Sequence, residues 1–202
     1  RIVVRDNGGG SRDALRELLP YFLDQPARVV NVGAARLRKG QAPDHEGGYL
    51  DNRYLWPAQW KGWSAAAKKA IEQAKAKFRP DWKLPKGEFS DWHYMVIERK
   101  PDTPRYRKPV VVLIDPGCFS ATDIFVGAFA ELPTVTLLGQ TTGGGSGRSR
   151  SIRLPRSGIT VRLSSMASFR PDGSRYDGKG IAPDVEHVPT PSDLAGTTDS
   201  AL

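Results

Sequence analysis

The sequence has only one cysteine among its 202 residues, Cys118. A disulfide within the chain is therefore excluded, and a zinc site built on cysteine thiolates is not expected. Long apolar runs are also absent, since no stretch reaches the ~18 consecutive apolar residues of a transmembrane helix. Residues 1–5 are too short an apolar stretch for a signal peptide, and we interpret them as a strand that continues from sequence further upstream.

Acidic residues are outnumbered by basic ones, because 22 Asp and Glu against 30 Lys and Arg leave a net charge of +8. Most basic residues are scattered among acidic ones. The densest basic cluster alternates with apolar residues, as on one face of a pair of strands: Arg148, Arg150, Arg153, Arg156 and Arg162. A basic surface can attract nucleic acid, anionic lipid or acidic peptides. We interpret the cluster as a solvated basic face and expect no nucleic-acid partner.

Apolar runs separated by glycine loops predict an α/β fold. Residues 1–5 indicate a buried strand that ends in a glycine loop at 7–10, and Ser11 is a candidate N-cap for the following helix. Residues 28–32 indicate a second strand, and this strand–loop–helix–strand order is typical of a parallel sheet. The other predicted elements are a doubly covered strand at 110–114, a helix at 120–132, a strand at 134–138, and a hairpin of 151–154 with 159–163.

Residues 39–107 differ in composition from the rest of the chain. They contain all five tryptophans: Trp56, Trp60, Trp63, Trp82 and Trp92. Residues 64–78 predict one amphipathic helix with a core-facing stripe of Trp63, Ala67, Ile71, Ala74 and Phe78. We therefore predict the start of the core at 1–38, an insertion or lid at 39–107, a core with the candidate nucleophile at 108–190, and a fraying tail at 191–202.

Ser120 stands where an apolar strand ends in a sharp turn and a helix begins. Such a junction exposes a side chain at the top of a sheet and directs the first helical N–H groups toward whatever that side chain attacks. Serine at this position is also an ordinary helix N-cap, so the junction alone leaves both roles open.

Two glycine loops follow predicted strands. The first, at residues 7–10, could bring a backbone N–H close to a ligand, or could be a tight turn into the helix. The second, at residues 139–146, is similar to a phosphate-binding loop, but Gly145 stands where that motif needs a lysine. Nucleotide binding is therefore not expected.

Four stretches together resemble the peptidase domain of the C-terminal-processing (tail-specific) proteases and the related tricorn core protease. They occur in that family's order and lie at residues 2–10, 109–123, 138–144 and 171–184. The resemblance implies a crotonase-like (ClpP-like) α/β spiral with a Trp-rich insertion, polypeptide substrates, and neither a metal nor an organic cofactor. It also implies that Ser120 is the nucleophile, that the Ala121 N–H is one oxyanion donor, and that Gly9 or Gly10 supplies the other.

The general base is where this sequence departs from the C-terminal-processing branch. That branch carries a basic lysine in the second glycine loop, at the place of Gly145, and the nearest basic residue here is Arg148. Arginine is a poor base because its pKa stays above about 12. The tricorn-like branch uses a histidine and an acidic residue, and Asp177 matches that acidic position, although a turn beside Gly178 explains it equally well.

The resemblance places the catalytic histidine upstream of residue 1, and none of His45, His93 and His187 matches a family position. We therefore predict a serine peptidase that forms an acyl-enzyme on Ser120, with a histidine base from a missing N-terminal segment; this fragment could then be inactive alone. The alternative is a non-catalytic ligand- or peptide-binding module on the same fold. Whether a PDZ or helical N-terminal domain precedes residue 1 in the full-length protein stays open. A periplasmic or secreted location is favoured over a cytoplasmic one, and the oligomeric state stays open.

Overall fold

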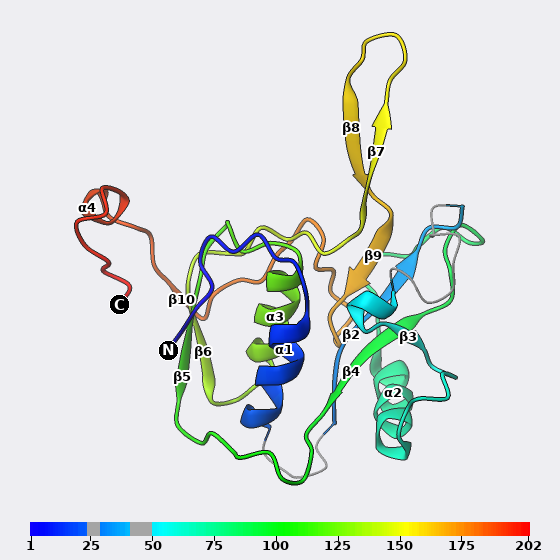
Figure 1. The fold of residues 1–202 in the computed structure, drawn as a ribbon, viewed down its shortest axis with the longest axis horizontal. Coiled ribbons are helices and arrows are strands. Elements are labelled where there is room, and N and C mark those ends of the chain that lie inside the picture. The colour runs from blue at the N-terminus through cyan, green and yellow to red at the C-terminus, as the bar shows by residue number, and fades with distance from the viewer. Residues whose placement is uncertain (24–28, 41–49) are drawn as a thin grey trace.

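The structure, a computed structural model, describes residues 1–23, 29–40 and 50–202. Two sheets share the α helix that follows Ser120, and a long hairpin stands away from the body (Figure 1). The helical elements are α1 (Asp13–Leu18), η1 (Leu19–Phe22), η2 (Asp51–Arg53), α2 (Ala65–Lys77), α3 (Ala121–Ala130) and α4 (Pro191–Leu194). The strands are β1 (Ile2–Val3), β2 (Val29–Leu37), β3 (Trp56–Pro57), β4 (His93–Glu98), β5 (Val110–Ile114), β6 (Val135–Gly139), β7 (Ser149–Arg153), β8 (Thr160–Ser164), β9 (Met166–Phe169) and β10 (Val185–Glu186).

The first sheet is parallel, with the strand order β1-β5-β6-β10. Its central strand β5 pairs with β1 through Ile2 and Val112, and with β6 along its whole length. Four of the five β5 residues are buried, as the predicted doubly covered strand requires. Nine of the ten α3 residues are also buried, because α3 contacts β6 of this sheet and β2 of the other. Strand β5 and helix α3, which flank Ser120, are thus anchored in the centre of the molecule.

The second sheet is antiparallel, with the order β3-β4-β2-β9. The sequence-based prediction that residues 28–32 continue a parallel sheet with residues 1–5 was therefore wrong. Strand β2 pairs instead with β4 and β9, and β1 finds its partner more than a hundred residues later, in β5. Strand order and glycine loops in sequence do not reveal such distant partners.

Residues of the predicted insertion, 39–107, are integrated into this second sheet. Strand β4 pairs with β2 on one side and with β3 on the other. Helix α2 packs on the same sheet with the predicted stripe inward, since Ala67 and Ile71 are buried. Beside it Trp56 stacks on Trp60 at 4.4 Å between ring centroids. The boundary between insertion and core stays a prediction.

The tail does not fray as the polar sequence after Thr190 predicted. Thr190 and Asp193 form a capping box at the start of α4, and the Asp193 carboxylate also accepts hydrogen bonds from Thr198 and Ser200. Asp199 then forms an ion pair with Arg5, just after β1. Side-chain hydrogen bonds, rather than apolar burial, order this segment. No helix in the described part of the chain is long and apolar enough to cross a bilayer.

Candidate active site

Ser120 occupies a strained elbow between β5 and α3. Its backbone has φ +62° and ψ −117°, a conformation that a residue with a side chain rarely adopts. Such strain costs on the order of 1–3 kcal/mol and persists only where the surroundings enforce it, most often at functional sites. The Ser120 side chain makes no capping hydrogen bond. The sequence left open whether the Ser120 side chain caps α3 or takes part in catalysis. The structure shows no capping hydrogen bond, so the hydroxyl is free to react.

The N-terminal glycine loop holds this elbow in place. The Phe119 N–H donates to the Asn7 carbonyl at 3.0 Å, and the Thr122 hydroxyl donates to the Asn7 side-chain oxygen at 2.9 Å. One residue before Asn7, the Asp6 N–H donates to the Asp115 carboxylate at 2.9 Å. The parallel pairing of β1 with β5 brings these two loops to the same sheet edge, where both strands end.

Gly9 packs directly against the backbone on either side of Ser120. A Cβ at this position would lie 2.5 Å from the Phe119 carbonyl oxygen and 2.7 Å from both the Ser120 Cβ and the Ala121 nitrogen. The φ of Gly9 is +93°, which also excludes most side chains. The glycine thus serves two purposes, a backbone conformation and a close approach. The structure brings the first glycine loop and Ser120 together, as the predicted constellation requires.

The amides beside Ser120 differ in whether they are already hydrogen-bonded. The Gly9 N–H donates to the Asn7 side-chain oxygen at 3.0 Å. Within the described residues, the N–H groups of Gly10 and Ala121 donate to no protein acceptor. A cavity of about 140 Å³ is lined by Gly9 and Ala121 and has apolar walls that include Leu15 and Phe125. Of these three amides, the Ala121 N–H is the unsatisfied donor in the lining of this cavity.

The second glycine loop is fixed by two carboxylates. Asp123, in the first turn of α3, is fully buried and accepts hydrogen bonds from the Thr142 hydroxyl at 2.6 Å and from the Gly144 and Gly145 amides at 3.1 and 2.9 Å. Asp177 accepts from the amides of Ser146, Gly147 and Ser168 at 2.7, 2.9 and 3.2 Å. Burial raises the pKa of Asp177 even though these amides oppose the shift. Asp177, the predicted acidic residue, is therefore buried beneath the second glycine loop and accepts hydrogen bonds from the backbone amides of that loop.

The aromatic ring of Phe119 lies against Gly145, the residue at which the resemblance to the C-terminal-processing branch implies a lysine. A Cβ at Gly145 would lie 1.9 Å from the tip of that ring, which is 47% exposed and covers the loop. A backbone hydrogen bond links the same two segments, since the Gly143 N–H of the second glycine loop donates to the Cys118 carbonyl at 2.8 Å. A side chain at position 145 would therefore displace the Phe119 ring.

Cys118 lies two residues before Ser120 but is not a second nucleophile. It is fully buried, and burial raises the pKa of its thiol to about 12. Its Sγ–H donates to the Val4 carbonyl at 3.0 Å. Because the thiolate is the reactive form, this side chain is inert near neutral pH and serves packing.

The histidines lie in other contacts. His45 lies outside the described residues. His93, at the start of β4, is hydrogen-bonded to the Asp91 carbonyl at 2.9 Å, and burial lowers its pKa. His187 shares a hydrogen bond of 3.0 Å with Ser200 in the tail. The described part of the chain therefore brings no histidine into hydrogen-bond contact with Ser120, and it contains no cluster of three metal-ligating side chains.

A strained serine, a glycine loop pressed against it and an adjoining cavity form the arrangement of a serine-hydrolase site. Residues 2–187 match peptidase family S41, and the chain belongs to that family. The predicted resemblance to the C-terminal-processing and tricorn-like peptidases is confirmed at this level.

Named relatives agree with the family assignment. The chain is 33% identical over 78 residues to the carboxy-terminal-processing protease of Bartonella bacilliformis, which covers 39% of this chain and 18% of that protein. It is 37% identical over 79 residues to the carboxy-terminal processing protease CtpA of Bacillus subtilis, covering 39% and 17%. The chain thus aligns with less than a fifth of these curated relatives.

Solved structures show the same mixed α/β fold. One similar structure is a protein from Parabacteroides merdae that is described as a peptidase. It has a TM-score of 0.63 at 25% identity, and the match covers 98% of this chain and 48% of that one. Mature CPAF has a TM-score of 0.56 at 20% identity, covering 92% and 38%, and is similar in fold.

Sequence reasoning missed three side chains that build the site. Asn7 was noted only as the start of a glycine loop, yet its side chain ties Gly9 to Thr122. Asp123 was noted only as part of a motif, and a lone acid on the buried side of an apolar helix was the available signal. Phe119 gave no signal, because its place depends on a loop more than twenty residues further on.

Proposed function

We propose that this chain is the nucleophile-bearing part of a serine peptidase that cleaves polypeptides through an acyl-enzyme on Ser120. The observation that carries the proposal is the strained, uncapped Ser120 pressed against Gly9. Membership of peptidase family S41 and the names of its relatives support polypeptide as the substrate class.

In this mechanism the Ser120 oxygen attacks the scissile carbonyl carbon. The amides of Ala121 and Gly10 stabilise the oxygen anion that forms; of the two predicted glycine donors we favour Gly10, because the Gly9 amide is already used by Asn7. A histidine base from outside residues 1–202 takes the serine proton and returns it to the leaving amine, and water then hydrolyses the acyl-enzyme. Asp177 is the proposed acidic residue of the catalytic group. Its carboxylate is held in place by the hydrogen bonds that it accepts from the Ser146 and Gly147 amides.

We also propose the finer form of the fold, a crotonase-like (ClpP-like) spiral with residues 39–107 as a Trp-rich insertion. The parallel sheet and the helix that it shares with the second sheet support the spiral. The aromatic cluster of Trp56, Trp60 and Trp63 beside α2 supports a distinct, locally stabilised segment.

The test is labelling of the full-length protein with a fluorophosphonate probe. We expect covalent labelling of Ser120 and complete loss of labelling in Ser120→Ala. Ser11→Ala is the matched control, since Ser11 is exposed and lines the same cavity without being at the elbow, and it should label normally. Labelling that persists in Ser120→Ala would place the nucleophile elsewhere.

The second candidate is a non-catalytic binding module on the same fold. The observation that favours it is that the Phe119 ring lies against Gly145, while His93 and His187 are hydrogen-bonded elsewhere among the described residues. Absence of labelling in the full-length protein at every pH tested would select this candidate.

A further inference from the structure

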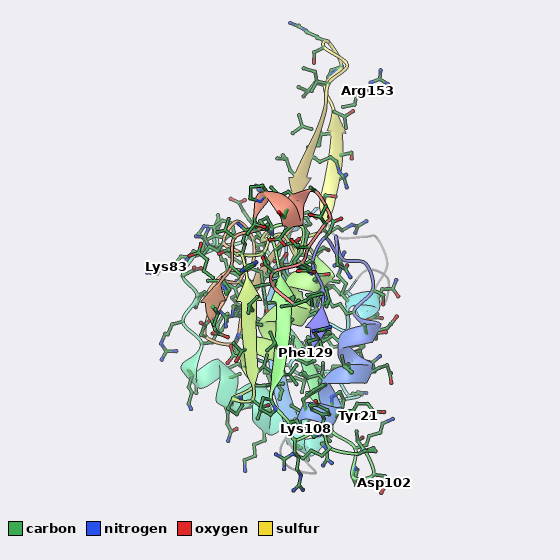
Figure 2. The ribbon with its side chains drawn as sticks, turned by 90° about the vertical axis from the view of Figure 1, so that its left-hand side faces the viewer. Tyr21, Lys83, Asp102, Lys108, Phe129 and Arg153 are labelled. Atoms are coloured by element: carbon green, nitrogen blue, oxygen red, sulfur yellow. The ribbon has the colours of Figure 1, made fainter. Side chains whose placement is uncertain are left out.

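The hairpin β7–β8 extends far from the body of the molecule. Figure 1 shows it as an isolated pair of strands, and Figure 2 shows the same projection after a quarter turn, with Arg153 on its outer part. Strand β7 pairs only with β8 in a two-stranded sheet, so neither outer edge is paired with another strand of the described residues. Both edges therefore present backbone N–H and C=O groups that can accept a further strand.

One face of this hairpin is apolar. The register pairs Ile152 with Val161, and the Leu154 N–H donates to the Ile159 carbonyl at 2.8 Å, so these four side chains share a face. Ile159 is 59% exposed, Ile152 46% and Leu154 41%. A two-stranded hairpin alone is marginally stable in water. Exposed apolar side chains on such an element indicate a surface that is covered in use.

The same segment is strongly basic. Arg153, Arg156 and Arg162 are exposed, and the sequence contains no Asp or Glu between Glu131 and Asp172. The register alternates faces, so Arg153 and Arg162 lie on the face opposite the apolar one, and residues 149–164 of the hairpin contain no carboxylate. Charge complementarity favours an acidic partner, and it disfavours a second copy of this chain, which would bring the same arginines together.

The hairpin begins at the candidate active site. The second glycine loop contacts Phe119 through Gly145 and Cys118 through Gly143, and β7 starts two residues after Gly147. Figure 1 shows the hairpin rising from the end of the body at which the loop before α1 lies, and Gly9 of that loop touches Ser120. The base of the hairpin therefore follows directly from a loop that packs on the residue before Ser120.

We propose that the β7–β8 hairpin is a substrate-docking surface that binds extended, acidic and apolar polypeptide by adding it as a strand to a free edge. Backbone pairing would hold the segment, apolar side chains would pack on the Ile152–Ile159 face, and acidic side chains would pair with the exposed arginines. A bilayer surface would satisfy the apolar face and the charge, but it offers no partner for the backbone groups along the edges. The inference rests on the proposed function, since it names the substrate class of that site.

The test measures binding separately from cleavage. The chain carrying Ser120→Ala is titrated against a fluorescein-labelled peptide in which Glu alternates with Val or Leu, followed by fluorescence anisotropy. Three peptides serve for comparison: one with Lys for Glu, one with Ser for Val and Leu, and one with alternate backbone nitrogens methylated. We expect only the parent peptide, in which Glu alternates with Val or Leu, to bind. Its affinity should fall about tenfold or more when NaCl rises from ~0.05 to ~0.5 M.

Matched variants identify the surface. Arg153→Gln combined with Arg162→Gln should weaken binding about tenfold, whereas Lys68→Gln combined with Lys69→Gln on exposed positions of α2 should not. Ile159→Ser should weaken binding, and Val188→Ser should not, although Val188 is 61% exposed. Unchanged tryptophan fluorescence from the distant Trp56–Trp63 cluster checks that each variant is folded.

Other outcomes overturn the inference. The inference fails if the hairpin variants bind the acidic peptide normally, or if the methylated peptide binds as well as the parent. It also fails if Ile159 is needed instead for sedimentation with anionic vesicles or for self-association. Failure of the proposed function is seen separately, as absent fluorophosphonate labelling with the peptide binding intact.

Discussion

The two glycine loops near Ser120 look alike in sequence but do opposite things. The first, at residues 7–10, is exposed and leaves the Gly10 amide without a protein acceptor among the described residues. In the second, at residues 139–146, the amides of Gly144, Gly145 and Ser146 are taken by Asp123 and Asp177. In the proposed mechanism, glycine in the first loop makes room for the substrate oxygen, while glycine in the second allows close packing on buried carboxylates. The predictions that follow test this difference.

The largest effect is expected for Gly9→Ala. The new Cβ would collide with backbone atoms of Phe119 and Ala121, which cannot move without moving β5 and α3, and the positive φ adds strain. Displacing the oxyanion donors should lower the rate of fluorophosphonate labelling about 100-fold or more.

The control for this change lies one residue earlier. A Cβ at Gly8 would meet nothing within 4 Å, and Gly8 does not have a positive φ. Gly8→Ala should therefore label at nearly the normal rate. Equal rates for Gly8→Ala and Gly9→Ala would mean that the first loop does not position donors at Ser120.

Asp123→Asn tests the second loop through stability. The introduced side-chain amide would turn its own N–H groups toward at least one of the three donors that now face a carboxylate in a fully buried site. We expect the free energy of unfolding to fall by about 2–4 kcal/mol, measured by urea denaturation. Asp172→Asn is the control, because Asp172 is an exposed residue that bonds to Ser174 within its own turn. A loss no larger than in that control would contradict a buried anchor.

Much of the first half of the site could be predicted from sequence. Ser120 at a strand-to-helix junction and three consecutive glycines after a strand are local patterns, and local patterns survive without knowledge of distant partners. The antiparallel pairing of β2 with β4 and β9 could not be predicted, because periodicity identifies a strand but not its neighbour. The ordering of the tail was missed because it depends on one carboxylate, Asp193, that meets several hydroxyls only after folding.

The contribution of Asp177 to stability should depend on pH. Burial raises its pKa in the folded protein above the ordinary value of 3.8, so its contribution to stability is fully present below that value and is lost as pH rises through the folded pKa. In Asp177→Asn the introduced amide does not titrate. The melting temperature of the natural chain minus that of Asp177→Asn should therefore be larger at about pH 4 than at about pH 7. A difference that grows with pH would show that the amide hydrogen bonds outweigh burial.

The smallest effect is expected for Gly145→Ala, the counterpart of Gly9→Ala in the other loop. Its Cβ would also collide, but only with the tip of the exposed Phe119 ring, and a side chain at the surface can rotate away where backbone cannot. The Gly145 amide would keep its bond to Asp123. Labelling should fall less than about tenfold, and Phe119→Ala added to the variant should restore it, because the ring is then gone. If Gly145→Ala were as damaging as Gly9→Ala even without the ring, the second loop would be part of the reacting centre and the contrast between the loops would fail.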